Sequence, residues 1–515
     1  MRPVLLAPLG FGTLVYANTY LTVSIPTSSP SRAVAVPADF FSFGFEAAFL
    51  PKFANDFSEN VVNAIGSRMS KPLIIRVGGT SGDLLRIKED LTMATHCFAG
   101  PGCPDNSKDS FYIGPSYFDG FKRFQNATMT FQAPMGREMD ILHTMAYVKN
   151  AWNALGKDRV AGIALGNEPG YYHHWTAKQY VTRALEVEDA ITKEFNLSGD
   201  AASIFEVGDI SNHASASNIP FGLEAIFKDG INKNGRGKFA AEHFYTINQE
   251  HSYSAKVLQE TLMDHTFIQS RLSSYQSSID YIEKNDPGTA FILSEVGSTL
   301  RPVPIDFAGG FGAAIWAVDF HLAAMCRGIK RVSNTQRPEA THAFWVPDDT
   351  GPLTKRPIVQ GIFPAAAFIT DFVGSANLGK ASEVSLTGQD RFTAYVIHGL
   401  TSDLAERVAL VNMKEWNENS NSVRGSATIT LNVGENVTSA TMRRMHADGG
   451  STAVGYDWGG SNNNVSYAGE QWTYAIDLGK GHYTNGSLVE ESLSVIDGKI
   501  EVSVPDTEAV LLFLK

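Results

Sequence analysis

Gly162-Ile163-Ala164-Leu165-Gly166-Asn167-Glu168-Pro169 is an apolar run that stops at an Asn-Glu-Pro tripeptide. It predicts a buried β-strand that ends before Pro169, because proline lacks an N–H for a sheet and disfavours helical backbone at the preceding residue. A second apolar run, Phe291-Ile292-Leu293-Ser294, also ends at a glutamate, Glu295. Either acid alone could simply cap the next helix. If the strands are parallel, however, their C-terminal ends meet on one face and the two carboxylates share one pocket.

Between residues 38 and 374, apolar runs alternate with helical patterns. The predicted strands are 40–46, 73–77, 127–132, 159–165, 203–207, 239–245, 289–294 and 329–332. Continuous apolar strands are typical of a parallel sheet that is buried on both faces. Eight such units favour a closed (β/α)8 TIM barrel, an α/β fold, over an open doubly wound sheet. No Gly-x-Gly-x-x-Gly follows the first strand, which weakens a dinucleotide-binding alternative. The predicted helices include a long one over 255–282 and a last one over 357–372.

The pattern changes in residues 377–515, where apolar and polar residues alternate with period two between Gly, Asn and Ser clusters. This alternation predicts a C-terminal antiparallel β-sandwich. Its expected strands are 392–397, 407–411, 426–433, 471–478 and 500–504. A Thr- and Val-rich strand within residues 18–30 can join the same module and would tie the two chain ends together.

Residues 1–17 resemble a signal peptide, with cleavage expected after Ala17. Five Asn-x-Ser/Thr sequons are compatible with a secretory route, so we expect a secreted glycoprotein. The sequons begin at Asn126, Asn196, Asn436, Asn464 and Asn485. The net charge of −12 argues against nucleic acid and anionic membranes as partners. We find no stretch long and apolar enough to span a bilayer and expect a monomer.

Cys97 and Cys103 bracket a short loop rich in turn formers. In a secreted protein this spacing favours a local disulfide over two free thiols. Cys326 lies in an apolar helical pattern and is expected to be a small core residue. Because no Cys/His cluster has metal-ligand spacing, we expect no metal and no cofactor.

Two carboxylates about 5–5.5 Å apart perform retaining glycoside hydrolysis, in which one attacks the anomeric carbon and the other serves as acid and then base. Asn167, next to Glu168, is placed to hydrogen-bond the sugar 2-OH, a contact that strengthens in the transition state.

Several motifs, in this order, are similar to glycoside hydrolase family 79, which holds β-glucuronidases and heparanase; the secreted fungal β-glucuronidases are the closest subgroup. These motifs are Arg76–Asp83, Gly166–Pro169, Glu242–Tyr245, Ser294-Glu295 and Gly328–Val332. The resemblance covers nearly the whole chain. It implies that Glu168 is the acid/base and Glu295 the nucleophile. It also implies that Glu46, Thr80 and Asp83 contact sugar hydroxyls and that Tyr245 hydrogen-bonds the nucleophile.

Simpler roles remain open for some of these residues. Glu46 can cap the following turn, Asp83 can pair with Arg76 or Arg86, and His243 can fill a polar core position.

The chain also departs from the family where the uronic carboxylate is recognised. A family tyrosine after the nucleophile corresponds to Leu300, and a second, after the eighth strand, is replaced around Phe344-Trp345. A glucuronate still needs hydrogen-bond donors. Arg301, His342 and Lys355 are candidates for that role, and Trp345 is a further candidate substrate contact.

The sequence therefore predicts a retaining hydrolase that removes terminal β-linked glucuronic acid, its 4-O-methyl form included, from glycans or glucuronides. One alternative is a heparanase-type endo-β-glucuronidase, which the acidic composition disfavours because sulfated chains need basic rims. A clan-A exo-glycosidase for a neutral sugar is favoured by the missing tyrosines. A carbohydrate-binding pseudoenzyme is disfavoured by the presence of both glutamates.

Overall fold

The computed structural model describes residues 19–96, 111–136, 140–211, 221–248, 252–301, 303–349, 356–374, 379–386, 388–455 and 464–515. The predicted signal peptide, Cys97, Cys103 and Lys355 lie outside the described residues.

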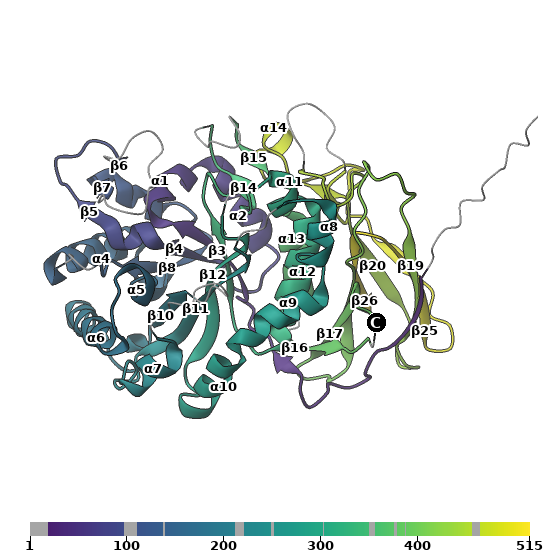
Figure 1. Cartoon of the computed structure of the whole chain (residues 1–515), viewed down its shortest axis with the longest axis horizontal. Coiled ribbons are helices and arrows are strands. Elements are labelled where there is room, and N and C mark those ends of the chain that lie inside the picture. The colour runs from purple at the N-terminus through teal and green to yellow at the C-terminus, as the bar shows by residue number, and fades with distance from the viewer. Residues whose placement is uncertain are drawn as a thin grey trace, which may run out of the picture.

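A closed barrel of eight parallel strands forms the first part of the molecule, as predicted. Its strands are β3 (Phe41–Glu46), β4 (Ile74–Gly78), β8 (Thr128–Ala133), β9 (Val160–Leu165), β10 (Phe205–Ser211), β11 (Gly237–Ile247), β12 (Ala290–Thr299) and β13 (Val332–Gln336). They follow this order around the barrel, and β13 pairs in parallel with β3 to close it. The (β/α)8 fold class is confirmed, so the C-terminal ends of all eight strands face one side (Figure 1).

Three predicted elements need correction: two helices outside the barrel and the eighth barrel strand. Residues 255–282 form not one helix but α8 (Ala255–Glu260), α9 (His265–Leu272) and α10 (Gln276–Asn285), because Asp264 caps a new N-terminus at α9. The last helix of the barrel region, α13 (Pro364–Val373), begins later than predicted, at a proline suited to its first turn. The eighth strand lies over Val332–Gln336, later than predicted, because its residues after Val332 are polar and break the expected apolar run.

The other helices of the barrel region are α1 (Leu50–Phe53), α2 (Asp56–Gly66), α3 (Asp119–Lys122), α4 (Ile141–Leu155), α5 (Pro169–Tyr172), α6 (Ala177–Glu194), α7 (Leu223–Lys228), α11 (Ile305–Ala308) and α12 (Phe311–Cys326). Short strands beside the barrel are β5 (Leu85–Ile87), β6 (Thr95–His96), β7 (Phe111–Ile113), β14 (Trp345–Val346) and β15 (Ile358–Val359).

Two β-sheets pack against each other at the C-terminal end. The small sheet joins β1 (Thr19–Ser24), β19 (Ser426–Asn432) and β25 (Lys499–Pro505). The large sheet includes β2 (Val34–Ala35), β16 (Gly379–Val384), β17 (Phe392–Gly399), β18 (Ala405–Asn412), β20 (Ala440–His446) and β26 (Glu508–Leu514), with short strands β21 (Ser466–Tyr467), β22 (Glu470–Gln471), β23 (His482–Tyr483) and β24 (Glu491–Leu493) beyond β20. The N-terminal segment thus pairs with both sheets. The strand predicted over 471–478 is instead β22 followed by α14 (Tyr474–Asp477), which Thr473 caps.

The large sheet is buried on both faces. In β17, Ala394 and Val396 point to the small sheet, whereas Tyr395 and Ile397 belong to the core shared with the barrel helices. This follows from the period-two alternation of side chains along a strand. The helices α12 and α13 fill the layer between the barrel and this sheet (Figure 1).

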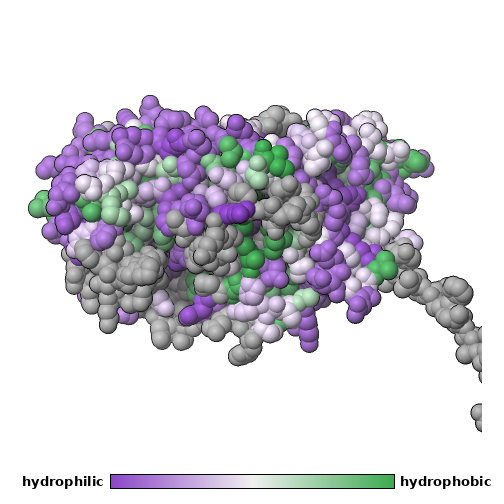
Figure 2. Space-filling view, turned by 90° about the horizontal axis from the view of Figure 1, so that it is seen from above, coloured by the Kyte–Doolittle hydropathy of each residue, from purple (hydrophilic) through white to green (hydrophobic). Residues whose placement is uncertain are grey.

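The helix α12 is apolar on every side, as expected of a helix enclosed on all faces. By length and composition, Ile305–Cys326 could cross a membrane, which corrects the sequence expectation, but its most apolar 18 residues are all buried within the protein. The outer surface seen in Figure 2 is largely hydrophilic, with hydrophobic residues in small patches.

A buried acid on α12 ties the barrel to the large sheet. The Asp319 side chain accepts hydrogen bonds from Thr393 at 2.8 Å and from Tyr395 at 2.7 Å, and it pairs with His265 at 2.9 Å. His265 also faces Glu383 of β16 at 3.2 Å. Burial alone would lower the pKa of His265, but the charge of Asp319 and the hydrogen bonds to Asp319 and Glu383 outweigh it and raise the pKa to about 10.

Replacing His265 with glutamine should destabilise the protein by about 3 kcal/mol at pH 6, because Asp319 is left buried without its cation. A histidine pKa raised by folding stabilises fully below the unfolded pKa of about 6.5 and loses that effect as the pH rises to about 10. The difference in unfolding free energy between wild type and His265→Gln should therefore shrink at pH 10.5. Urea unfolding at both pH values measures it; an equal difference at both would contradict a charged His265.

Candidate active site

Glu168 lies just past the end of β9, in a turn that its neighbours hold in place. Its backbone is left-handed, with a φ of 42°, which costs about 1–2 kcal/mol for a residue with a Cβ. The Glu168 N–H donates to the Asp209 carbonyl at 2.9 Å, and the Asn167 N–H donates to Asp83 Oδ2 at 3.1 Å. Pro169 then opens the short helix α5. These contacts fix a strained turn whose acid is buried, with 4% of its surface exposed.

Glu295 lies within β12, where the pairing with β13 shifts register between Leu293 and Val296. Such an irregularity re-aims a side chain. The Tyr245 hydroxyl donates to Glu295 Oε1 at 2.7 Å, and Arg76 Nη1 donates to Oε2 at 3.4 Å. The hydrogen bond from Tyr245 has the geometry expected from the family resemblance.

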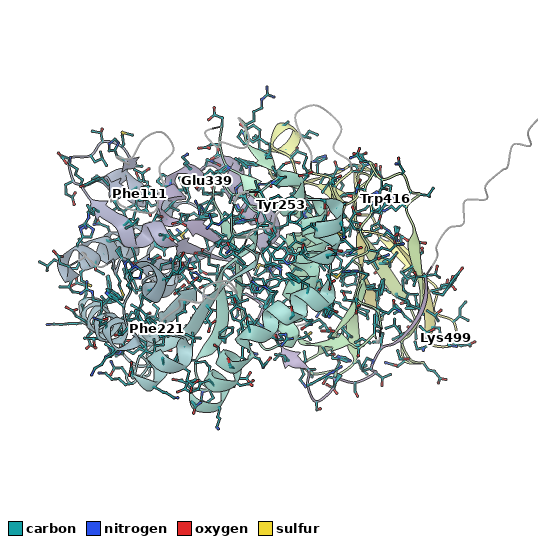
Figure 3. The ribbon with its side chains drawn as sticks, viewed as in Figure 1. Phe111, Phe221, Tyr253, Glu339, Trp416 and Lys499 are labelled. Atoms are coloured by element: carbon teal, nitrogen blue, oxygen red, sulfur yellow. The ribbon has the colours of Figure 1, made fainter. Side chains whose placement is uncertain are left out.

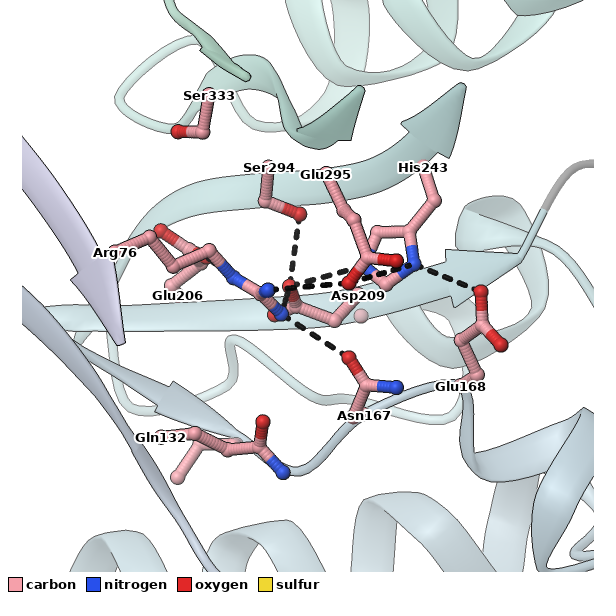
Figure 4. A network of polar contacts seen from close by, with 12 residues as sticks. Arg76, Gln132, Asn167, Glu168, Glu206, Asp209, His243, Ser294, Glu295 and Ser333 are labelled. Atoms are coloured by element: carbon pink, nitrogen blue, oxygen red, sulfur yellow. Dashed lines mark hydrogen bonds and ion pairs between the residues drawn. The ribbon is translucent and has the colours of Figure 1, made fainter. Parts of the chain in front are cut away.

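The two glutamates and His243 offer one oxygen or nitrogen each, and these atoms all lie within 4.8 Å of one another. The imidazole bridges the acids: Nδ1 is 2.8 Å from Glu168 Oε1 and 3.9 Å from Glu295 Oε2, and Nε2 is 3.4 Å from Asp209 Oδ1 (Figure 4). Burial opposes a charge on this ring, but Glu295, Asp209 and Glu168 outweigh it and raise the pKa of His243 to about 10. With the ring protonated the cluster is an ion-pair network, and a metal ion would have to displace that proton.

A second cation, Arg76 from β4, lies on the Glu295 side of the two glutamates (Figure 4). Its Nη2 donates to Asp209 Oδ1 at 2.7 Å and to Asn167 Oδ1 at 3.1 Å, and Nε lies 3.5 Å from Glu206. Burial and the neighbouring charge of Asp209 raise the pKa of Glu206 to about 7. Arg331, whose Nη2 donates to Glu206 Oε2 at 2.6 Å, acts in the opposite direction but does not outweigh them.

Glu295 is held in the charged form. Burial acts to raise its pKa, but the charges of His243 and Arg76 and the Tyr245 hydrogen bond together keep the pKa below its usual range. Asn167 is oriented by the same arginine, because its Oδ1 accepts from Arg76. Its buried Nδ2 has no partner among the described residues, so one amide donor remains for a ligand.

Asp83 supports the Glu168 turn. Its two oxygens accept from Gln132 Nε2 and the Met135 N–H as well as from Asn167, and Oδ2 lies 2.9 Å from His173 Nε2. These contacts occupy the carboxylate, so we assign Asp83 to holding the turn in place of the predicted sugar contact. The expected alternatives, pairing with Arg76 or Arg86, are absent from its contacts among the described residues.

Glu46 ends β3, and its Oε1 accepts from the N–H and the hydroxyl of Ser81. Burial, opposed by Arg337 and reinforced by Glu295, raises the pKa of Glu46. Thr80 is half-buried at the start of the turn that follows β4.

Two predicted substrate contacts need correction. The Trp345 side chain is fully buried, donates from Nε1 to Ser58 Oγ at 3.0 Å and packs edge-on against Phe43. Trp345 is therefore a core residue. Its indole packs at the interface between the barrel and the helices, a position that suits an aromatic side chain as well as a sugar-binding site does. Arg301 is exposed, and within the described part of the chain no contact joins it to the glutamates.

The sequence analysis missed two groups that the structure brings to the site. His243 is a bridge between carboxylates and not a filler of a core position, and Asp209, which orients it, was not considered. Asp209 lies in β10 and His243 in β11. Their position toward the C-terminal end of a barrel strand was the sequence feature that could have indicated a place in the site.

Comparisons with known proteins agree with this architecture. Residues 394–511 match the model of the glycosyl hydrolase family 79 C-terminal beta domain. The predicted resemblance to glycoside hydrolase family 79 is confirmed. A β-glucuronidase of Aspergillus niger is 25% identical over 96% of this chain and 94% of that relative. A β-glucuronidase of Neurospora crassa is 22% identical over 88% and 90%, respectively.

Solved structures share the fold. A 4-O-α-L-rhamnosyl-β-D-glucuronidase from Fusarium oxysporum, determined with Rha-GlcA, superposes with a TM-score of 0.77 at 19% identity, over 96% of this chain and all of that one. A GH51 arabinofuranosidase from Xanthomonas axonopodis gives a TM-score of 0.61 at 12% identity, over 97% of this chain and all of that one. The barrel with its β module is therefore common to family 79 and to other glycosidases.

Gly79 leaves space for the Glu46 carboxylate, and replacing this glycine tests whether Glu46 packs against it. Its φ of 95° with a ψ of −175° is a glycine-only region, and a Cβ there would collide with the Glu46 carboxylate. Gly156 has a similar backbone, with a φ of 81° and a ψ of 142°, and open space around it. We expect Gly156→Ala to cost about 1–3 kcal/mol from strain alone. Gly79→Ala should cost about 1–3 kcal/mol more, by overpacking. Denaturant unfolding measures both, and equal costs would show that Glu46 is not packed there.

Proposed function

We propose that this protein is a retaining glycoside hydrolase that removes terminal β-linked glucuronic acid by double displacement. The observation that carries the proposal is the approach of the Glu168 and Glu295 side chains to within 4.8 Å at the C-terminal face of the barrel. That separation suits a covalent glycosyl-enzyme, because inverting enzymes hold their carboxyl groups about 6.5–9.5 Å apart to admit a water molecule. The β-glucuronidase relatives support glucuronate as the sugar.

In the first step Glu295, held ionised by its cationic neighbours, attacks the anomeric carbon. Glu168 gives a proton to the departing glycosidic oxygen, so the bond to the aglycone breaks as the sugar–Glu295 ester forms. The Asn167 Nδ2 donor binds the sugar at C2. The Tyr245 hydroxyl, which donates to Glu295 Oε1, holds the nucleophile in position.

In the second step Glu168, now deprotonated, takes a proton from water, and the resulting hydroxide attacks the anomeric carbon. The bond between that carbon and Glu295 breaks, which frees the Glu295 carboxylate and releases glucuronate with retained configuration. His243 stays protonated through both steps. Its hydrogen bonds to Glu168 and Asp209 keep the acid/base oriented.

We also propose that the protein is secreted and glycosylated. All five sequon asparagines, predicted from the sequence as acceptors, are exposed in the structure. Exposure is required of a glycosylation site, and it supports the proposal beyond the chance occurrence of the triplets.

Azide rescue tests the two catalytic roles. With p-nitrophenyl β-glucuronide, Glu295→Ala and Glu168→Ala should each lose about 100- to 10,000-fold in rate. Azide should restore Glu295→Ala by attack on the open α face, giving the α-glucuronyl azide. It should restore Glu168→Ala by attack on the glycosyl-enzyme, giving the β-azide. NMR of the products identifies the anomer.

The matched control is Glu224→Gln, an exposed helical glutamate that should keep wild-type activity. Swapped azide anomers would reverse the assignment of the two roles. Absence of any hydrolysis by the wild type, across glucuronide, glucoside and xyloside, would favour a binding protein.

Tyr245→Phe should lower kcat/KM by about 10- to 100-fold, because a hydrogen bond to a charged group is lost. That bond favours the ionised form of Glu295, so its loss should raise the pKa of the nucleophile. The acidic limb of the kcat/KM profile should therefore move to higher pH. Tyr20→Phe, at a position that is 75% exposed, is the control. A limb that stays in place or moves to lower pH would contradict the role of Tyr245.

A further inference from the structure

Asn167, Glu168 and Glu295 would together orient a bound sugar. The donor Asn167 Nδ2 follows β9, the fourth barrel strand, and faces the position of the 2-OH. In a pyranose ring C2 and C5 lie opposite each other, so a C5 carboxylate points to the wall across the barrel from β9. In a barrel of eight strands that wall is the eighth strand, β13.

Arg337 follows the last residue of β13. The β13–β3 register pairs Gln336 with Phe45, so Arg337 is level with Glu46 at the C-terminal rim. Its side chain is 30% exposed. The register therefore puts a partly exposed guanidinium at the rim to which the parallel strands also deliver the nucleophile. The influence of its charge on the pKa values of Glu46 and Glu295 agrees with this placement.

Glu339 orients this guanidinium and leaves one edge open. Its Oε1 accepts from Nε at 3.1 Å and from Nη2 at 2.7 Å. Nη1 has no hydrogen-bond partner in the described part of the chain. The Nη1–Nη2 edge can thus bind a second carboxylate bidentately. Glu339 lies in the barrel half of the molecule, far from Trp416 of the β module (Figure 3).

The charge of the nucleophile favours such a cation. Glu295, held ionised, repels the carboxylate of an entering glucuronate, and a cation placed beside that carboxylate offsets the repulsion. Arg76 cannot compensate, since it is only 3% exposed and already serves Asp209, Glu206 and Glu295.

We propose that Arg337 binds the C5 carboxylate of the terminal uronic acid and is the residue that selects a uronide over a neutral glycoside. This inference rests on the proposed function and assigns the recognition that the missing family tyrosines left open. It replaces Arg301 in that role.

His342 completes this wall as an acceptor. Its ring meets Tyr245 edge-on with centroids 5.8 Å apart, one nitrogen is hydrogen-bonded to the Thr299 carbonyl, and the buried Nε2 has no partner among the described residues. Burial and the charge of Arg337 lower the pKa of His342 to about 4. A neutral ring that donates to Thr299 presents a lone pair at Nε2. It suits a sugar hydroxyl and not a carboxylate, which leaves the carboxylate to Arg337.

The test compares kcat/KM for p-nitrophenyl β-glucuronide with kcat/KM for the β-glucoside in wild type, Arg337→Gln, Arg337→Lys and Arg301→Gln. Arg337→Gln should lower the glucuronide-to-glucoside ratio by about 100-fold, the loss expected for a bidentate charged contact. Arg337→Lys keeps the charge but not the fork and should lower the ratio by about 10-fold. Arg301→Gln should change it by less than about threefold. Thermal unfolding of each variant controls for folding.

Two results would overturn the inference alone: a ratio that survives Arg337→Gln, or one that falls with Arg301→Gln, while the wild type prefers the glucuronide. A wild type that hydrolyses the glucoside better would instead sink the proposed function, and the role of Arg337 with it. A loss of rate that is equal for both substrates would also refute a carboxylate contact, because it would indicate a structural defect.

Discussion

Two carboxyl groups can lie within 4.8 Å of each other in a buried pocket only if nearby cations offset their charges or one of them holds a proton. Here protonated His243 contacts both Glu168 and Asp209 and lies near Glu295, and Arg76 joins Glu295 to Asp209 and Glu206. The arrangement gives the two glutamates different environments. Glu295 contacts Tyr245 and Arg76 and stays ionised, whereas Glu168 contacts the imidazole and lies on a strained turn. Unequal environments of this kind are what separate a nucleophile from an acid/base.

The barrel explains how residues far apart in the sequence form this cluster. Arg76, Asn167, Asp209, His243 and Glu295 come from five different strands or from the turns that follow them, and all five are delivered to one rim. The surrounding layers keep that rim rigid. The apolar helix α12 is enclosed between the barrel and the large β-sheet, and Asp319 with His265 fixes the two parts to each other.

The alternation of apolar runs and helical patterns was enough to predict the barrel, because burial on both faces leaves a plain signal in a parallel strand. It failed for β13, whose residues after Val332 are polar although the strand is fully buried. The catalytic pair could be predicted since an acid at a strand end has a fixed direction. The partners of that pair could not, because the bridge from His243 to Glu168 spans 75 positions and depends on register and rotamer. Trp345 shows the opposite error: an aromatic side chain fits a core and a sugar equally well, and only packing decides. Arg337 was overlooked because its neighbour across the barrel seam, Glu46, is 291 positions away.

The most direct test of the central claim is to trap the covalent intermediate. Incubation with a 2-deoxy-2-fluoro-β-glucuronyl fluoride should inactivate the enzyme. Fluorine at C2 slows both steps, whereas the fluoride leaving group at C1 speeds only the first, so the glycosyl-enzyme accumulates. Peptide mass spectrometry should then place one glucuronyl adduct on Glu295. An adduct on Glu168, or on any residue outside this pair, would contradict the account.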